Sequence, residues 1–159
     1  MKLKTIGLVA TVAVLSACVK PVEVTQPPAT MALKNANFAQ RVVAYREPVL
    51  RTYTKVDGKQ SEVSGLRCVL DSAELKATVI TPVVVRVPTF KGKPTALRIS
   101  CEGGALAGET VINPQISGTA VGGASAAGLV AAVVSTAIIA SRDQWNFGAD
   151  GQPMSVIVK

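Results

Sequence analysis

The feature that most constrains this fold is a set of short runs in which apolar and polar residues alternate. Because successive side chains of a strand point to opposite faces, a period of two predicts half-buried antiparallel strands. No amphipathic helix of useful length lies between the runs, so the sequence predicts a mainly β fold, built as a small antiparallel β-sandwich. The apolar members of the clearest runs are Leu75, Ala77 and Val79; Val83, Val85 and Val87; and Leu97, Ile99 and Cys101.

Turn residues separate these runs and add further strands before them. Residues 38–46 and 49–56 are expected as strands, and Asp57-Gly58 suits a hairpin turn after the second. Thr81-Pro82 interrupts two of the alternating runs, and the segment from Pro88 to Thr95 separates the next two. Proline cannot donate to a strand ladder, so each of these prolines is expected at a strand end or an edge.

The chain begins with the pattern of a secretory signal. Lysines precede an apolar run from Ile6 to Leu15, and small residues follow it, so residues 1–17 are expected to be removed. The segment Leu15-Ser16-Ala17-Cys18 resembles the lipobox of bacterial lipoproteins. That resemblance implies cleavage just before Cys18, which would carry a diacylglycerol and an N-acyl chain. The alternative is an ordinary cleavage site with Cys18 incidental.

The same resemblance implies a location. Val19 follows the cysteine, whereas an aspartate there tends to retain lipoproteins in the inner membrane. We therefore expect a protein held by lipid in the outer membrane of a Gram-negative cell and facing the periplasm. Removing Lys2 and Lys4 with the signal lowers the formal charge from +7 to +5. Such a mildly basic balance usually means a solvated surface, and it leaves weak contact with acidic polymers open.

Residues 18–37 are expected as a flexible tether after the lipidated cysteine. The segment has three prolines, scattered charges and no sustained apolar period. Proline-rich chain stays extended, so a tether of this length would hold a β domain at residues 38–117 several nanometres from the membrane. The alternative is that the segment Val22 to Thr25 pairs with a sheet edge.

Cys68 and Cys101 remain once Cys18 is assigned to the lipid. In an exported protein they are expected to form a disulfide. Each lies on the apolar face of an alternating run, so both should point into the same core. On the chain-entropy model the bridge would stabilise the fold by about 3 to 4 kcal/mol. A redox-active or metal-binding pair is the alternative, but the sequence has neither a Cys-x-x-Cys spacing nor a histidine.

The segment from Ser64 to Ile112 resembles a recurring β module of bacterial envelope lipoproteins related to PEGA-type domains. The matching features are Gly65 and Cys68 before a strand, Thr81-Pro82 before a valine-rich strand, the run from Leu97 to Cys101, and Gly103-Gly104. The Pro-Glu-Gly-Ala string itself is absent. The resemblance implies a small β-sandwich that binds or displays rather than catalyses, and it carries over no functional residue.

Residues 118–141 form an uncharged stretch rich in small residues. It satisfies the length rule for a membrane-spanning helix, which is about 20 mainly apolar residues. Small residues recur at every fourth position, a spacing that lets two helix backbones approach closely. We therefore favour a glycine-zipper helix or helix pair that is buried by self-association or by a partner, with a true span or a loose tail as alternatives. The predicted helix-packing ridge is Ala120, Ala124, Gly128, Ala132, Thr136 and Ala140.

Residues 142–159 form the last region. Trp145 and Phe147 are read either as anchors at a membrane interface or as side chains that cover the sheet. The segment from Met154 to Lys159 has the pattern of a closing strand. If that strand returns to the β domain, the glycine segment is an insertion between strands, which argues against a span.

No residue pattern specifies a reaction. The chain has no histidine, and no nucleophile motif, metal-ligand set or phosphate loop is evident, so no catalytic residue, metal or cofactor is predicted. Nucleic-acid binding is not expected of an exported chain. We predict a non-catalytic outer-membrane lipoprotein with a structural or assembly role, whose partner is a second copy or another envelope protein. The alternative is a membrane-inserting lipoprotein associated with a pore or with secretion.

Overall fold

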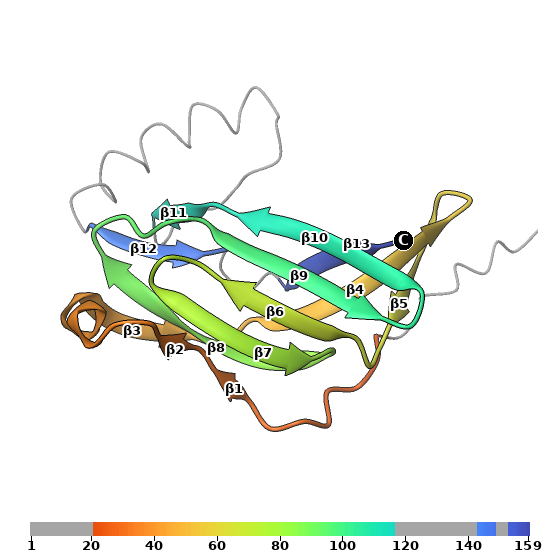
Figure 1. Cartoon of the computed structure of the whole chain (residues 1–159), viewed down its shortest axis with the longest axis horizontal. Coiled ribbons are helices and arrows are strands. Elements are labelled where there is room, and N and C mark those ends of the chain that lie inside the picture. Colours follow the sequence, from red (N-terminus) through yellow and green to blue (C-terminus); the bar gives the residue numbers. More distant parts are fainter. Residues whose placement is uncertain (1–20, 117–142, 149–152) are drawn as a thin grey trace, which may run out of the picture.

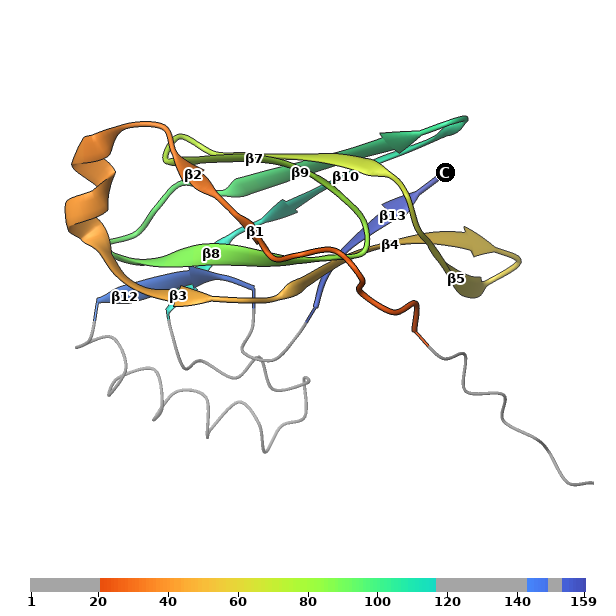
Figure 2. The same cartoon turned by 90° about the horizontal axis from the view of Figure 1, so that it is seen from below.

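The computed structural model describes residues 21–116, 143–148 and 153–159, and in these ranges the chain is mainly β. Two sheets lie one above the other, as the edge-on view in Figure 2 shows. The predicted mainly β, antiparallel character is confirmed. The expected signal peptide at residues 1–17, Cys18, and the uncharged stretch at 118–141 lie outside the described residues.

The smaller sheet has five strands, and all its pairings are antiparallel. It forms the front layer in Figure 1. Three of its strands have the alternating pattern, and two of these three contain Cys68 and Cys101. In spatial order the strands are β10 (Leu106–Ile112), β9 (Leu97–Gly103), β6 (Arg67–Asp71), β7 (Leu75–Ile80) and β2 (Ala32–Leu33).

The larger sheet has eight strands and is built around β8 and β4. Its main path is β11 (Pro114–Ile116), β12 (Gln144–Phe147), β8 (Val83–Lys91), β4 (Val49–Val56) and β13 (Met154–Val158). Off this path, β1 (Ala29–Thr30) and β3 (Val42–Arg46) pair with β8, and β5 (Lys59–Val63) pairs with β4. The pairings of β13 with β4 and of β1 with β8 are parallel.

The core lies between the two sheets and follows the predicted alternation. In β8 the side chains of Val83, Val85 and Val87 are buried while Arg86 is exposed, and in β9 Leu97, Ile99 and Cys101 are buried while Arg98 is exposed. The burial of one face of each sheet supplies the main driving force for folding. The largest fully buried apolar side chains are Phe90, Leu50, Leu70, Leu75, Leu97, Ile99, Val83, Val85, Val156 and Val158.

The two sheets meet along one side, where β10 runs beside β13. The amide of Ala107 donates to the carbonyl of Lys159 (3.1 Å), and the amide of Lys159 donates back to the carbonyl of Ala107 (3.0 Å). Gly108 next to this pair lies against the backbone of Ile157. The last strand therefore connects the edges of both layers.

The expected strand over residues 38–46 is wrong in its first half. Residues Ala36–Arg41 form a 3₁₀ helix, and the strand begins only at Val42. Asn35 caps the helix by accepting a hydrogen bond from the amide of Asn37 (2.9 Å). At the other end the Arg41 guanidinium donates to the carbonyls of Lys91, Gly92 and Lys93. These contacts are made with a distant loop, so the local alternation does not reveal them.

Of the two positions expected for Pro88, a strand end or an edge, the strand end is wrong, because β8 continues to Lys91. In the pairing register Pro88 faces only Tyr45 of β3. The positions that pair with β1 come before it, and those that pair with β12 come after it. The missing amide proton is tolerated because the strand has a single partner at this point. Thr81-Pro82 does separate β7 from β8 as predicted.

The C-terminal region returns to the β domain. β13 lies parallel to β4, and β12 pairs with both β11 and β8. Phe147 is buried in the core, whereas Trp145 is partly exposed and donates through Nε1 to Asp143 (3.1 Å). Ile116 and Trp145 are direct neighbours in the β11–β12 register. The chain between these strands is therefore an insertion within the larger sheet.

Candidate functional site

The predicted disulfide is present between Cys68 and Cys101. The two residues lie directly opposite each other on β6 and β9, and both are buried. The bridge therefore links adjacent strands of one sheet and points into the core, as the two alternating runs predicted. It bonds two segments that are 33 residues apart in the sequence.

A clamp on the N-terminal segment is the most specific polar arrangement outside the core. Arg51 of β4 and Glu62 of β5 form an ion pair across the hairpin. The amide of Val22 donates to Glu62 Oε2 (3.0 Å), and Arg51 Nη1 donates to the carbonyl of Val22 (2.8 Å). Both backbone groups of one residue are thus bound by the two members of the pair. We call Val22, Arg51 and Glu62 the N-terminal clamp.

The ion pair of the clamp is shielded from solvent, whereas Val22 itself is exposed. The side chains of Arg51 and Glu62 are 14% and 6% exposed, whereas the pair between Arg86 and Glu47 is 50% and 58% exposed. An exposed pair contributes little because water screens it. A shielded pair with additional hydrogen bonds holds its partners in one geometry.

The clamp changes the interpretation of residues 18–37. The chain is held from Val22 onward, because Gln26 also donates from Nε2 to the carbonyl of Ile80 (3.0 Å). The short strands β1 and β2 then lie inside the range expected as a tether. The alternative of sheet-edge pairing at Val22 to Thr25 is not seen either, since strand pairing begins at Ala29. Two-residue strands have too few positions for an alternating pattern to predict.

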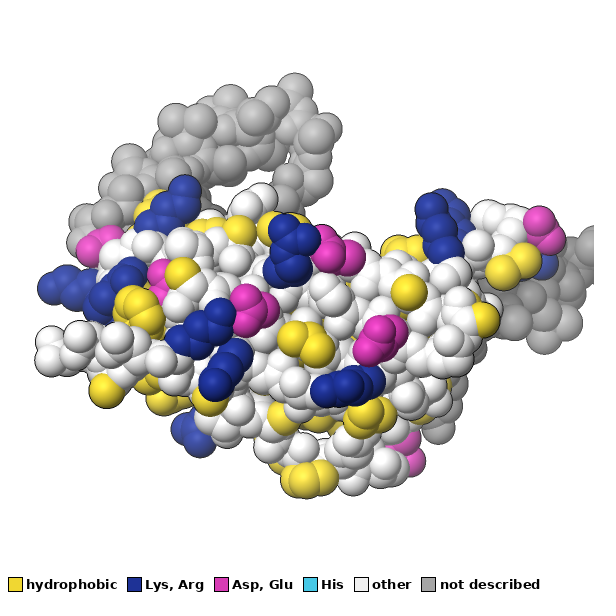
Figure 3. Space-filling view, in the orientation of Figure 1, with side chains coloured by type: hydrophobic (Ala, Val, Ile, Leu, Met, Phe, Trp, Pro, Cys, Tyr) yellow, Lys and Arg dark blue, Asp and Glu magenta, His cyan; other side chains and the backbone are white. Residues whose placement is uncertain are grey.

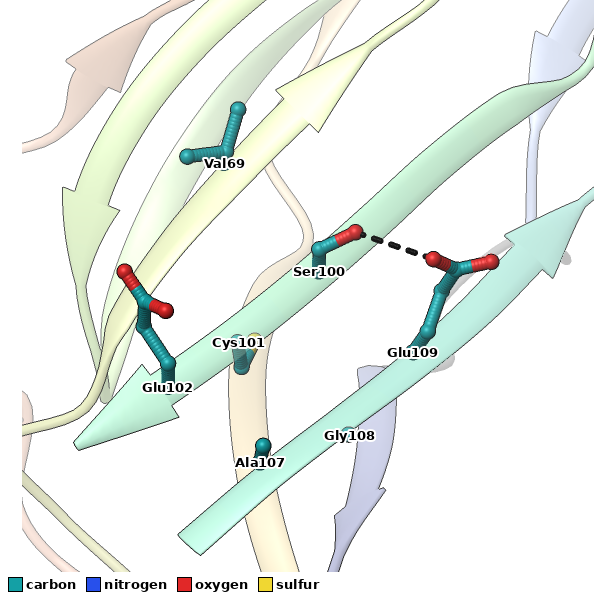
Figure 4. A pocket seen from close by; sticks show the side chains of 7 residues that line it. All are labelled: Val69, Ser100, Cys101, Glu102, Ala107, Gly108 and Glu109. Carbon is teal, nitrogen blue, oxygen red and sulfur yellow. Dashed lines mark hydrogen bonds between the residues drawn. The ribbon is translucent and has the colours of Figure 1, made fainter. Parts of the chain in front are cut away.

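The outer face of the five-stranded sheet carries a shallow groove of about 490 Å³. Figure 4 shows its lining on β6, β9 and β10. Ser100 Oγ donates a hydrogen bond to Glu109 Oε2 (3.3 Å). Glu109 is also ion-paired with Arg98, and both side chains are about half exposed. The lining residues are Val69, Ser100, Cys101, Glu102, Ala107, Gly108 and Glu109.

The chemistry of this groove is limited. A serine becomes a nucleophile when an adjacent base takes its proton, and the base is oriented by a third group. Here the neighbour of Ser100 is a solvated carboxylate that already binds a guanidinium. Figure 3 shows basic and acidic side chains interspersed over this face. The arrangement is that of a charge-balanced, solvated surface.

Buried polar groups elsewhere stabilise loops. The Glu74 carboxylate accepts from the Thr95 hydroxyl (2.6 Å) and the Thr95 amide, which ties the β6–β7 turn to the loop before β9. Thr52 and Thr81 share a hydroxyl contact of 2.8 Å in the core. Each group has its partners inside the fold, so these clusters read as structural.

Within the described ranges, no three His, Cys, Asp or Glu side chains are grouped to hold a metal ion. No helix formed by the described residues is long and apolar enough to cross a membrane. Comparisons with protein-family models, with curated proteins and with solved structures found no match. The fold and its contacts therefore define the chain only as a disulfide-bonded, mainly β protein with a clamped N-terminal segment.

Of the residues singled out from the sequence, the structure brings together Cys68 and Cys101. The lipidation residue and the predicted helix-packing ridge lie outside the described ranges. Arg51 and Glu62 were missed. The signal that could have found them is the Asp57-Gly58 turn, which sets the hairpin register and places Tyr53 opposite Glu62, two residues beyond Arg51.

Proposed function

We propose that this chain is a non-catalytic, lipid-anchored protein of the bacterial outer membrane, facing the periplasm. The observation that carries the proposal is the lipobox-like segment ending at Cys18, followed after three residues by a clamped, disulfide-bonded β domain. A disulfide persists in an oxidising compartment, which is consistent with export. The two facing sheets support a β-sandwich, and the PEGA-type relationship remains a proposal.

We propose further that residues 118–141 serve assembly rather than a single membrane crossing. The support comes from their flanks. A single span would place its two ends on opposite faces of a hydrocarbon layer about 30 Å thick. Ile116 and Trp145 are instead paired strand neighbours, and adjacent strands lie about 4.8 Å apart. The 26 residues from 117 to 142 are also too few for two crossings of about 20 residues each.

The lipid anchor is tested by fractionation. Cys18→Ala would be expressed behind an ordinary cleavable signal and compared with the wild-type chain after an alkaline carbonate wash of the membranes. We expect the wild-type protein to stay with the membrane and the variant to wash off. Retention of the variant would contradict a purely lipid anchor and favour insertion of the uncharged stretch. Intact mass of the wild-type protein reports the acyl chains directly.

The assembly role is tested with matched bulk substitutions. Gly128→Leu with Ala132→Leu adds bulk to the predicted helix-packing ridge, while Ala127→Leu with Ala131→Leu adds the same bulk to a neighbouring row. We expect crosslinked species in detergent to disappear only in the ridge variant. The assembly role would lose its support if the wild-type protein were monomeric, or if both double substitutions reduced the crosslinked species equally.

A further inference from the structure

We propose that the tip of the β4–β5 hairpin, residues Lys55 to Gln60, is held against the headgroup layer of the membrane that carries the lipid anchor. The inference rests on the proposed lipidation of Cys18. It concerns the orientation of the domain and the surface that meets the bilayer, neither of which follows from lipidation itself.

Few residues separate the proposed lipid anchor from the clamp. Four residue steps lead from Cys18 to Val22, whose backbone is held by Arg51 and Glu62. A fully extended chain covers at most about 3.5 Å per residue, so the clamp lies within about 14 Å of the anchored cysteine. A free tether through residue 37 would have allowed the domain to stand several nanometres away and to face in any direction. The clamp removes most of that freedom.

The start of the described chain lies beside the β4–β5 hairpin. Figures 1 and 2 both show the first described residues at the same end of the molecule as the β4–β5 hairpin. The clamp is built from this hairpin, since Glu62 pairs with Tyr53. Three further pairs lead to Val56 and Lys59 at the tip, which is about 10 Å along a strand. This distance is shorter than the length that the four residue steps from Cys18 to Val22 can span.

The tip of the hairpin combines an exposed apolar side chain with lysines. Val56 is 66% exposed, more than any other exposed large apolar side chain of the described residues. Lys59 lies directly opposite it, and Lys55 precedes it. Lysine side chains place their stems along an apolar surface while the ammonium groups reach phosphates. Asp57 in the turn is the one acidic residue between Lys55 and Gln60, so the tip is net positive.

Figure 3 shows basic, apolar and acidic side chains together over this hairpin. An apolar side chain flanked by lysines suits the boundary between headgroups and acyl chains. On the outer face of the five-stranded sheet, Arg98 is paired with Glu109 and Lys34 with Asp71, so these two cations are already matched by carboxylates. The hairpin tip is therefore the better match to an anionic lipid surface.

The test uses tryptophan fluorescence of the anchored protein. Val56→Trp is introduced in a Trp145→Phe background, and the mature chain is reconstituted in vesicles of phosphatidylethanolamine and phosphatidylglycerol with brominated acyl chains. Val43→Trp is the matched control, because Val43 is also an exposed strand valine but lies on β3 at the other end of the fold. We expect a blue shift and loss of most of the emission at position 56, and neither change at position 43.

Two further variants test whether the short connection to Cys18 and the two lysines hold the tip at the membrane. A Gly/Ser linker of about 20 residues inserted between Lys20 and Pro21 should reduce quenching at position 56 toward that at position 43. The segment between Cys18 and the clamp would then be too long to keep the hairpin close to the membrane. The double substitution Lys55→Gln with Lys59→Gln should also reduce quenching at position 56, and this reduction should be greater in anionic than in neutral vesicles. Both changes are on exposed or terminal chain, so the fold should remain intact.

Failure of this inference is distinguishable from failure of the lipid anchor. Intact mass shows whether Cys18 carries acyl chains. If it does, equal quenching at positions 56 and 43 overturns the inference and leaves the anchor standing. If it does not, the thiol of Cys18 is coupled to a maleimide phospholipid, since Cys68 and Cys101 are bridged, and the same comparison decides the inference.

Discussion

Gly108 of β10 and Ile157 of β13 meet backbone to backbone where the two sheets join. A Cβ atom added to Gly108 would lie 2.2 Å from the Ile157 carbonyl oxygen and 2.9 Å from its carbonyl carbon. The nearby amide and carbonyl groups of Ala107 and Lys159 form a reciprocal pair of hydrogen bonds. Glycine at this position lets the C-terminal strand reach the edge of the five-stranded sheet.

Gly108→Ala is therefore expected to destabilise the protein. The opposing atoms are backbone, so the clash is relieved only by moving β13 away from β10, and overpacking of this kind costs about 1 to 3 kcal/mol. Urea unfolding followed by circular dichroism measures the loss. Ala107→Ser on the exposed face of the same strand is the control and should change stability by less than about 0.5 kcal/mol. An unchanged midpoint for Gly108→Ala would mean that the two strands separate without cost.

Loss of the disulfide should have a larger effect. Cys68→Ala with Cys101→Ala removes a cross-link between segments 33 residues apart, and the expected loss is about 3 to 4 kcal/mol because the unfolded chain regains its freedom. The measurement is the unfolding free energy in urea, compared with that of the wild-type chain under reducing conditions. The two values should agree, since both report the same missing bond. A loss below about 1 kcal/mol would contradict a constraint on the unfolded chain.

The Glu74–Thr95 contact should stabilise the adjoining loops. Glu74→Ala removes a buried carboxylate that accepts hydrogen bonds from the amide and hydroxyl of Thr95, and the loss of hydrogen bonds to a charged group costs about 1 to 3 kcal/mol. Glu102→Ala, on the exposed outer face, removes the same type of side chain and should cost little. Thermal unfolding of the two variants makes the comparison. Equal decreases in Tm for the two variants would show that the Glu74 carboxylate does not stabilise these loops.

The N-terminal clamp should slow hydrogen exchange at Val22. In Glu62→Ala the amide of Val22 loses its acceptor and Arg51 loses its ion-pair partner, so exchange at this amide should approach the rate of free chain. Glu47→Ala breaks an exposed pair with Arg86 and serves as the control. Exchange measured by mass spectrometry on N-terminal peptides reports the difference. Similar rates in all three proteins would show that the segment is not held.

Part of the fold follows directly from local pattern. The alternating runs in β7, β8 and β9 predict which side chains are buried, because a strand between a core and water has a period of two. The same pattern places both cysteines on core faces, and the Asp57-Gly58 turn predicts the β4–β5 hairpin. These features depend on neighbours in the sequence, so the sequence is enough to predict them.

Other features depend on contacts between distant segments. The 3₁₀ helix before β3 is fastened by Arg41 to carbonyls about 50 residues away, and β8 continues through Pro88 because of where its partners lie. The clamp on Val22 joins the start of the domain to a hairpin about 30 to 40 residues later. None of these contacts has a signature in the sequence next to the residues that make it.

By itself, the sequence determined the mainly β class, the buried faces of the central strands and the pairing of Cys68 with Cys101, because each follows from side-chain period, turn residues and cysteine count. Only the tertiary structure decided that Val22 is held by the β4–β5 hairpin, how β13 joins the two sheets at Gly108, and that Ile116 and Trp145 are neighbours. These relationships come from packing and hydrogen bonds between segments far apart in the chain. A local sequence pattern does not identify the distant segment that a residue will contact.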